Sequence, residues 1–420
     1  MKVRRYVLIF CLFSISLSLL PAFYITQPVR HIDARNLAMG DVQGSNAEGL
    51  YALFMNPAGI VRRNEAILHS GGLGVSAALE PELLAAAEAY AQDIQGDGSI
   101  PAMNELLSHA DFRNGVGAVE NHVLGASFYG LAFGISYDTD FLVKQYSPEE
   151  PVSMDYQFGL TMAGGGSLRF QLGENYLYVG ASVRQVYQAF SHAEIVTDSA
   201  ADLVANWEFQ DTIPAVLASG LAFDAGVIYS AEPFILSLSV RDIGGTTLSC
   251  QESTFSEAVD LFHQSHEALR QLYSPKELFD PTGIKPTFHG EYIEDLVIPM
   301  SVIVGGGIDF DLAQALRLQL LGEYRVSTEY ITSLQIPQNT SPDTFWQDLH
   351  IGAELDILDT LQIRAGINQG YLTGGVGLSF IRFFSLVDLS MNLTYYSWEA
   401  GSYAGKTQTE ALKFDVILSL

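Results

Sequence analysis

The chain has 420 residues, of which 48% are hydrophobic and only 16% are charged. Soluble domains usually carry about 25% charged residues, so this composition is unusually apolar. After the N-terminal segment no apolar run reaches the roughly 18 residues of a membrane-spanning helix, which excludes helical membrane spans. The formal net charge of −27 argues against a nucleic-acid partner, because contacts to phosphates need lysine and arginine.

Residues 1–22 predict a secretory signal peptide. Lys2, Arg4 and Arg5 form a basic start, Tyr6–Leu20 is a continuous apolar run, and the small residue Ala22 marks the expected cleavage point. The run is about 15 residues long, shorter than the roughly 20 that cross a bilayer as a helix. Export is therefore expected, and a retained membrane anchor stays the alternative.

From residue 120 onward apolar and polar residues alternate with a period of two in many segments. In 349–356, for example, Leu349, Ile351 and Leu355 alternate with polar residues or glycine. Successive strand residues point to opposite faces, so each such segment has one apolar and one polar face. A soluble sandwich has the same alternation, but several of these segments reach the roughly 10 residues that cross a bilayer as a tilted strand. Tyrosine and phenylalanine also gather near segment ends, as in the aromatic girdles of membrane barrels.

The pattern predicts an all-β fold, a transmembrane antiparallel β-barrel of about 14 strands with a plugged lumen and helical insertions in the outer loops. The strands are expected near 65–77, 115–128, 131–141, 154–164, 175–190, 217–229, 233–242, 296–308, 315–327, 346–356, 360–367, 373–382, 385–397 and 410–420.

The predicted connections alternate in length along the chain. Those after odd-numbered strands are mostly long, the longest being 78–114 and 243–295, and those after even-numbered strands are short, as at 230–232 and 357–359. Outer-membrane barrels have long outer loops, short periplasmic turns and an even number of strands. The alternation is expected of a barrel from 64 to 420 whose large loops face outside.

Two of the long loops have helix-like patterns. Residues 81–92 begin with a proline followed by strong helix formers, and residues 254–273 place Phe255, Val259 and Phe262 at helical spacing. Both helices are interpreted as packing against the barrel rim. An apolar landing site at the barrel mouth is the alternative.

Residues 23–63 lie between the signal and the first strand, and they are too polar and irregular for membrane strands. They contain many small residues, which pack tightly in a narrow space, and an Asn-Pro pair that favours a turn. The residues that attract attention are Arg35, Met39, Gly40, Asn56, Pro57 and Ala58.

With these residues directly before the first strand, the chain resembles the FadL-type family of outer-membrane transporters for long-chain fatty acids and other hydrophobic compounds. The segment from Gly220 to Gly245 is similar to a strand pair of the related PorV-like branch and of the spirochaete FadL-like branch. The resemblance implies a 14-stranded barrel whose N-terminal hatch, residues 23–63, plugs the lumen, with the six residues above in gating. It also implies a lateral exit for the ligand through a kinked strand.

Signals for catalysis or cofactor binding are weak. Phosphate-loop, Cys-x-x-Cys and nucleophile-elbow motifs are missing from the sequence, so no enzyme activity and no cofactor are expected. His263, His266 and Glu267 are read as solvated loop residues rather than as a metal site. The glycine triplets Gly164–Gly166 and Gly305–Gly307 mark bends or close packing, and a kink that opens a side exit is a hypothesis for either.

The leading hypothesis is uptake of long-chain fatty acids or other hydrophobic small molecules through the outer membrane, whose lipid is the other expected partner. The alternatives are a PorV-like barrel that serves a secretion machinery, a surface adhesin that uses the large loops, and an open aqueous porin. The porin is disfavoured because the hatch would obstruct its channel.

Overall fold

The computed structural model describes residues 33–76, 116–144, 151–195, 213–262, 290–327, 345–346, 348–383, 387–399 and 408–420. The predicted signal peptide, the loop 78–114 with its expected helix, and the His263, His266 and Glu267 group fall outside this part of the chain.

Within the described residues sixteen strands form one antiparallel sheet. Three short helices precede them: α2 (Ala34–Ala38), η1 (Tyr51–Phe54) and η2 (Pro57–Arg62). The strands are β1 (Glu65–Ser76), β2 (Val116–Phe128), β3 (Leu131–Lys144), β4 (Val152–Leu172), β5 (Asn175–Ile195), β6 (Pro214–Ala231), β7 (Phe234–Arg241), β8 (Thr246–Thr254), β9 (Tyr292–Ile298), β10 (Ser301–Ala313), β11 (Leu316–Ser327), β12 (Leu349–Ile357), β13 (Leu361–Asn368), β14 (Tyr371–Phe383), β15 (Val387–Glu399) and β16 (Gln408–Ser419).

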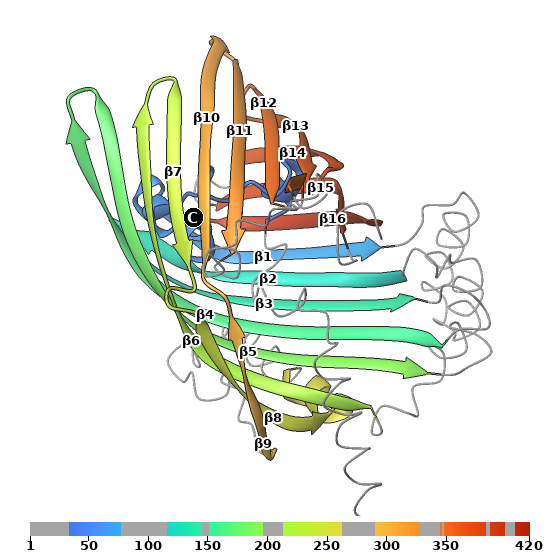
Figure 1. The fold of residues 1–420 in the computed structure, drawn as a ribbon. Helices are drawn as coiled ribbons and strands as arrows, with labels where there is room; N and C mark the ends of the chain where they lie inside the picture. The colour runs from blue at the N-terminus through green and yellow to red at the C-terminus, as the bar shows by residue number, and fades with distance from the viewer. Residues whose placement is uncertain are drawn as a thin grey trace, which may run out of the picture.

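The sheet closes into a ring of fourteen members. β1 pairs with both β2 and β16, and β5 pairs with β6, so the order of neighbours returns to its start. β7 and β8 both pair with β6, one after the other, while β10 and β9 pair with β7 and β8. β7 with β8, and β10 with β9, are therefore two interrupted strands of one closed wall (Figure 1). The predicted barrel of 14 strands is confirmed.

The wall is interrupted at residues 242–245, between β7 and β8. Asp242, Gly244 and Gly245 have φ angles of +53°, +82° and +82°. Glycine adopts such angles without strain, and aspartate tolerates them better than most residues. We call this segment the wall interruption. Only Pro299 and Met300 lie opposite it, between β9 and β10.

Two sequence predictions need correction. The range 243–295, read as one outer loop, contains β8 and most of β9. Neither glycine triplet opens the wall as the side-exit hypothesis requires, because Gly164–Gly166 and Gly305–Gly307 pair with both neighbouring strands without a shift in register. β4 continues through its glycines to Leu172, eight residues beyond the predicted end.

The outward face of the wall carries an apolar belt. Alternate residues are exposed and large, among them Leu131, Phe133, Leu221, Phe223, Leu236, Val304, Ile351, Val376, Leu393 and Phe414. The residues between them face the lumen and are mostly polar. This alternation is the pattern of a barrel that contacts lipid outside and polar groups inside. No helix in the described part of the chain is long and apolar enough to cross a membrane.

Residues 255–262 form a helix that follows β8 and covers the outward face of β3–β6 near their outer ends. The Phe262 ring stacks on Phe158 with 5.1 Å between centroids, and Phe255 meets Tyr156 edge to face at 4.7 Å. β4 and β5 are 21 residues long, about twice what a tilted strand needs to cross a bilayer. The helix therefore packs on wall that extends beyond the membrane, as its rim-packing interpretation predicted.

Candidate functional site

Residues 33–64, which we call the N-terminal segment, lie within the barrel (blue in Figure 1). The segment starts with α2, whose first turn is capped by Asp33: its carboxylate accepts a 2.9 Å hydrogen bond from the Arg35 amide. η2 is capped in the same way by Asn56, whose side-chain oxygen accepts from the Ala58 amide at 3.2 Å. Pro57 follows at the first helical position, where its missing N–H costs nothing.

The segment approaches the wall so closely that the wall must lack side chains at the contact. A Cβ on Gly226 would lie 1.8 Å from Asn56 Oδ1, and one on Gly180 would lie 2.3 Å from the Pro57 carbonyl oxygen. On the segment itself, Gly40 has φ +72° and leaves no room for a Cβ beside the Ile351 and Ile367 carbonyls. The Asn-Pro pair and Gly40 are thus required by direct backbone packing against the wall.

Wall side chains also satisfy the segment's backbone polar groups, which would be costly to bury without partners. Thr394 Oγ1 donates to the Ala34 carbonyl at 2.8 Å, and Ser239 Oγ donates to the Met55 carbonyl at 3.2 Å. The Glu323 carboxylate accepts from the Gly44 amide at 2.7 Å. These contacts come from different parts of the ring, so they fix the segment on several sides.

The centre of the segment is an apolar core in contact with the wall. Its buried members are Ala47, Leu50, Ala52, Leu53, Phe54, Met55 and Ile60, packed with the wall residues Ile67, Val123, Ala132 and Ala163. Burial of such side chains contributes about 25 cal/mol per Å² of apolar surface. Met39 is buried against Leu321, and Ala58 is buried against Ile228 and Ile235.

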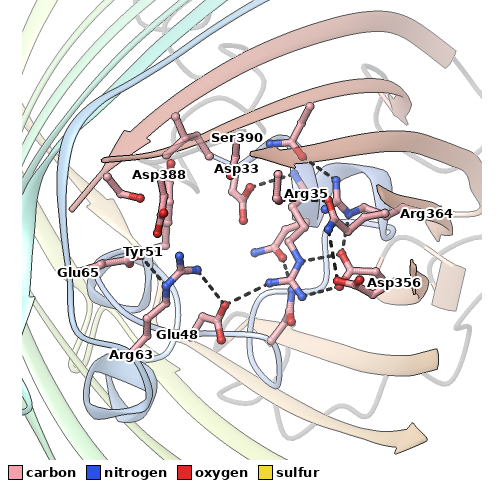
Figure 2. Close-up of a pocket in the computed structure, with 18 of the residues that line it drawn as sticks. Asp33, Arg35, Glu48, Tyr51, Arg63, Glu65, Asp356, Arg364, Asp388 and Ser390 are labelled. Carbon is pink, nitrogen blue, oxygen red and sulfur yellow. Dashed lines mark hydrogen bonds and ion pairs between the residues drawn. The ribbon is translucent and has the colours of Figure 1, made fainter. Parts of the chain in front are cut away.

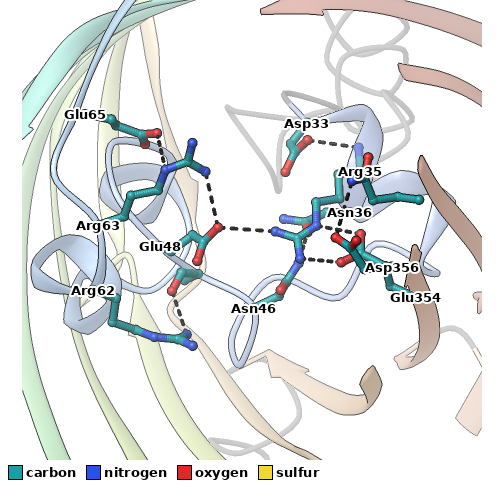
Figure 3. Close-up of polar contacts among 12 residues, drawn as sticks. Asp33, Arg35, Asn36, Asn46, Glu48, Arg62, Arg63, Glu65, Glu354 and Asp356 are labelled. Carbon is teal, nitrogen blue, oxygen red and sulfur yellow. Dashed lines mark hydrogen bonds and ion pairs between the residues drawn. The ribbon is translucent and has the colours of Figure 1, made fainter. Parts of the chain in front are cut away.

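A chain of ion pairs crosses the barrel on one side of the segment (Figure 3). From β1, Glu65 contacts Arg63 at 3.0 Å, and Arg63 contacts Glu48 at 3.5 Å. Arg35 then joins Glu48, at 3.3 Å, to Glu354 of β12, at 2.7 Å. Glu354 ends the chain with Arg364 of β13 at 2.6 Å. We call these six residues the ion-pair chain.

Glu48 and Arg35, at the centre of the ion-pair chain, hold each other in the ionised state. Burial alone would raise the pKa of Glu48, but the guanidinium groups of Arg35, Arg62 and Arg63 outweigh it and lower that pKa below its usual value. Burial likewise opposes the charged form of Arg35, and Glu354 and Glu48 reverse the effect, so the Arg35 pKa is raised. The segment is therefore bound to the wall through groups that stay charged at neutral pH.

The ion-pair chain borders a cavity of about 430 Å³ between the segment and the wall (Figure 2). Its lining includes Asp33, Gln319, Asp356 and Asp388, and the turn residue Asp359. The short turns lie at this end of the barrel, which faces the periplasm in an outer-membrane protein. We call it the periplasmic cavity. Its charged lining does not suit an apolar ligand.

A second buried polar group lies in the lumen beside the wall interruption. The Arg184 guanidinium of β5 donates to both Asp224 oxygens, at 2.6 and 2.9 Å, and to Asp242 at 3.0 Å. Thr246 donates to the same Asp242 carboxylate at 2.8 Å. Since removal of one partner from a buried ion pair costs about 3–5 kcal/mol, this cluster ties β5 and β6 to both ends of the interruption.

Arg241, the last residue of β7, lies next to that cluster in the sequence and is itself buried, with 5% of its surface exposed. Its only recorded hydrogen bond is a long one, 3.4 Å, to Gln43 of the N-terminal segment, and its Nε and Nη2 find no partner. Arg184 Nη1 also lacks one. The lumen thus holds guanidinium donors with no acceptor among the described residues, an expensive arrangement.

Apolar side chains continue along the lumen from this point toward the outer end. They are Val186, Ala218, Ala222, Leu248, Cys250 and Ile298, with Phe190, Val216 and Leu296 packed against them, and we call them the lumenal apolar cluster. Ala222 stands opposite Arg184 in the β5–β6 register, so the cluster begins beside the guanidinium groups. Unlike the lumen-facing apolar residues that pack on the N-terminal segment, the residues of this cluster form a separate core.

The structure places the six sequence-predicted hatch residues in two groups. Arg35, Met39 and Gly40 contact β11–β14, and Asn56, Pro57 and Ala58 contact β5–β7. Asp224 and Arg241 lie in the segment from Gly220 to Gly245 that carries the family resemblance, but no role was assigned to them from the sequence, and Arg184 was not noted. The sequence signal that could have found these residues is a charged side chain at a lumen-facing position within an otherwise apolar strand. In the described part of the chain, no group of three or more His, Cys, Asp or Glu residues is arranged to hold a metal ion.

Comparisons with solved structures find barrels of FadL type. The chain matches a FadL homologue from Pseudomonas aeruginosa at 12% identity and a TM-score of 0.45, covering 93% of this chain and 98% of that one. It matches the toluene transporter TbuX of Ralstonia pickettii at 12% and 0.46, over 93% and 99% of the two chains. The toluene transporter TodX of Pseudomonas putida gives 12% and 0.43, over 92% and 96%.

No protein-family model matches the chain. No curated protein matches it either. At these identities and TM-scores the likeness adds nothing to what the strand pairing itself shows, a closed antiparallel barrel of 14 members.

Proposed function

We propose that this protein takes up hydrophobic compounds across the outer membrane, and that its preferred ligands are long-chain fatty acids. The observation that carries the proposal is the lumenal apolar cluster beside Arg241, a buried guanidinium with two N–H groups unpartnered. An apolar tail on the cluster would gain about 25 cal/mol per Å² buried. A carboxylate head would supply the acceptor that Arg241 lacks.

In this proposal the N-terminal segment is the hatch, and its gating residues are the six named above. The support is its position: it touches strands around the ring through buried contacts, and Gln43 of the segment is the hydrogen-bond partner of Arg241. A ligand carboxylate competes with Gln43 for the guanidinium. Binding therefore weakens one contact between the segment and the wall.

The proposed exit is lateral, at the wall interruption. Apolar side chains stand on both faces of the wall here, beside the buried cluster of Arg184: Ala222 and Leu248 face the lumen, while Phe223, Ile243 and Val297 are exposed on the outward face. Arg241 pairs with Ser301 and Thr246 pairs with Ile298, so the four residues 242–245 lie opposite only Pro299 and Met300, and the ladder of hydrogen bonds between these two interrupted strands is incomplete. An apolar ligand meets no continuous polar backbone there.

The test is binding of a fluorescent long-chain fatty acid to the purified full-length barrel in detergent. Arg241→Gln should weaken binding about tenfold to a hundredfold, since hydrogen bonds to charged groups contribute roughly 1.5–3 kcal/mol. The methyl ester of the same acid, which lacks the charge, should bind wild type and variant equally. Saturable binding of the ester with the same affinity as the acid would leave hydrophobic uptake standing and rule out the fatty acid preference. Absence of saturable binding for both would contradict the uptake proposal.

A further inference from the structure

We infer that the periplasmic cavity binds an organic cation, an aliphatic ammonium group carried by a small amine or by a lysine side chain. This inference does not depend on the transport proposal, because the cavity and the lumenal apolar cluster share no residue.

The charges around the cavity do not balance. Its lining holds seven carboxylates and four guanidinium groups. Each of the four guanidinium groups already forms an ion pair with a carboxylate. Among the described residues Asp33, Asp356 and Asp359 form no ion pair, so negative charge is left over on both the N-terminal segment and the wall that line this space.

The strongest single indication is Gln319 of β11. It lies on the cavity wall with only 6% of its surface exposed, and its amide oxygen Oε1 finds no hydrogen-bond donor in the part of the chain that the structure describes. An unpartnered amide oxygen in a buried position is unfavourable, because it has lost its hydrogen bonds to water. A ligand that donates hydrogen bonds and carries positive charge would satisfy Gln319 and offset the carboxylates together.

Asp33 supports the same conclusion from the segment side. Its carboxylate caps α2, and beyond the Arg35 amide it has no donor recorded among the described residues. Burial raises the pKa of Asp33 above its ordinary value, with Asp415 adding to the effect against Arg35 and its amide. An ammonium group in the cavity would stabilise the charged carboxylate and so lower the pKa of Asp33 toward its ordinary value.

The chemistry of the space selects an alkylammonium rather than a metal or an anion. The described residues offer no cluster with metal-ligand geometry. An anion would meet excess carboxylate, because the guanidinium groups are already paired. The lining also includes apolar surface from Ile67, Leu389 and Ile417, on which a methylene stem can lie. The volume of about 430 Å³ is within the usual range for small-molecule sites, roughly 300–1,000 Å³.

The experiment is calorimetric titration of the full-length barrel in detergent with spermidine at low salt. Saturable binding is expected, and an uncharged diol of similar length should not bind. Gln319→Leu, Asp33→Asn and Asp356→Asn should each weaken spermidine at least tenfold. Asparagine still caps a helix, so Asp33→Asn keeps α2. The matched control is Asp295→Asn, which removes one exposed carboxylate on β9 and should leave binding unchanged.

A trilysine peptide titrated in parallel distinguishes the source of the ammonium group. Tighter binding of the peptide than of spermidine assigns the cavity to a basic segment of a periplasmic protein, and the reverse assigns it to a free polyamine. The inference would be overturned if spermidine bound with equal affinity to the wild type, the three cavity variants and Asp295→Asn. It would also be overturned if the diol bound the wild-type protein as tightly as spermidine does. If a variant fails to fold, the comparison of spermidine with the diol on the wild-type protein still decides.

Discussion

Arg35 was selected from the sequence only by its position in a motif, and the structure gives it a physical role. Its guanidinium contacts Glu354 of the wall with two nitrogens, at 2.7 and 2.8 Å, and Glu48 of the segment with the third. Two parallel hydrogen bonds to a carboxylate are a geometry that arginine forms and lysine does not. Arg35 is therefore the point at which the first turn of the segment is attached to β12.

Loss of that attachment should loosen the segment without unfolding the wall. Arg35→Ala leaves Glu354 and Glu48 with fewer partners, and we expect docking of residues 33–64 to weaken by about 2 kcal/mol, discounted because Arg35 is partly exposed. Hydrogen exchange of segment amides, such as those of Leu50 and Gly44, should then be faster, while exchange in β4 and β5 is unchanged. Arg169→Ala, which removes an exposed arginine of β4, is the control. Unchanged protection in Arg35→Ala would show that the ion-pair chain does not hold the segment.

At the scale of elements, the sequence predicted the strands well because the alternation of lipid-facing and lumen-facing residues is local. It failed where non-local contacts decide. β4 continues through Gly164–Gly166 since β3 and β5 pair with it on both sides, although glycine by itself suggests a break. β8 was assigned to a loop because its residues, such as Thr247, Ser249 and Gln251, are polar on the face that the lipid pattern requires to be apolar.

The candidate site was predictable only in part, for a related reason. Asn56, Pro57 and Gly40 have backbone requirements that a motif records. The partners of Arg35, and the pairing of Arg184 with Asp224 and Asp242, depend on strand register across the ring, which the sequence pattern does not specify.

The register of β6 and β8 provides a test of the exit at the wall interruption. Ala218 stands directly opposite Cys250, and opposed residues of antiparallel strands have Cα atoms about 4.5–5.5 Å apart, within the range for a disulfide. Ala218→Cys should therefore form a disulfide with Cys250 that fastens β8 to β6. Fatty acid uptake by cells that carry this variant should fall under oxidising conditions and recover after reduction. Ala218→Cys with Cys250→Ser has no disulfide partner and should not respond. Undiminished uptake by the fully oxidised variant would place the exit elsewhere.

At the scale of the whole molecule, the wall and the N-terminal segment have different sources of stability. Each described wall strand except β9, which pairs only with β8, is paired on both sides, so closure of the ring satisfies most of the wall backbone without help from the lumen. The segment has only short helices, and isolated helices of that length are not stable in water. It is ordered by the wall, whereas the wall does not need the segment to complete its hydrogen bonds. This asymmetry is what a removable closure requires.

Deletion of residues 33–63 should consequently leave a folded barrel with an open lumen. In planar lipid bilayers the full-length protein should conduct little, and the deletion variant should give stable, ion-selective channels. Cation selectivity is expected, since the cavity lining keeps Asp356, Asp359 and Asp388 after Arg35 and Arg63 are removed with the segment. Far-ultraviolet circular dichroism and heat-dependent migration on gels establish that the variant has kept its strands. A folded deletion variant with no more conductance than the full-length protein would mean that other parts of the chain close the barrel, and that the N-terminal segment is not its hatch.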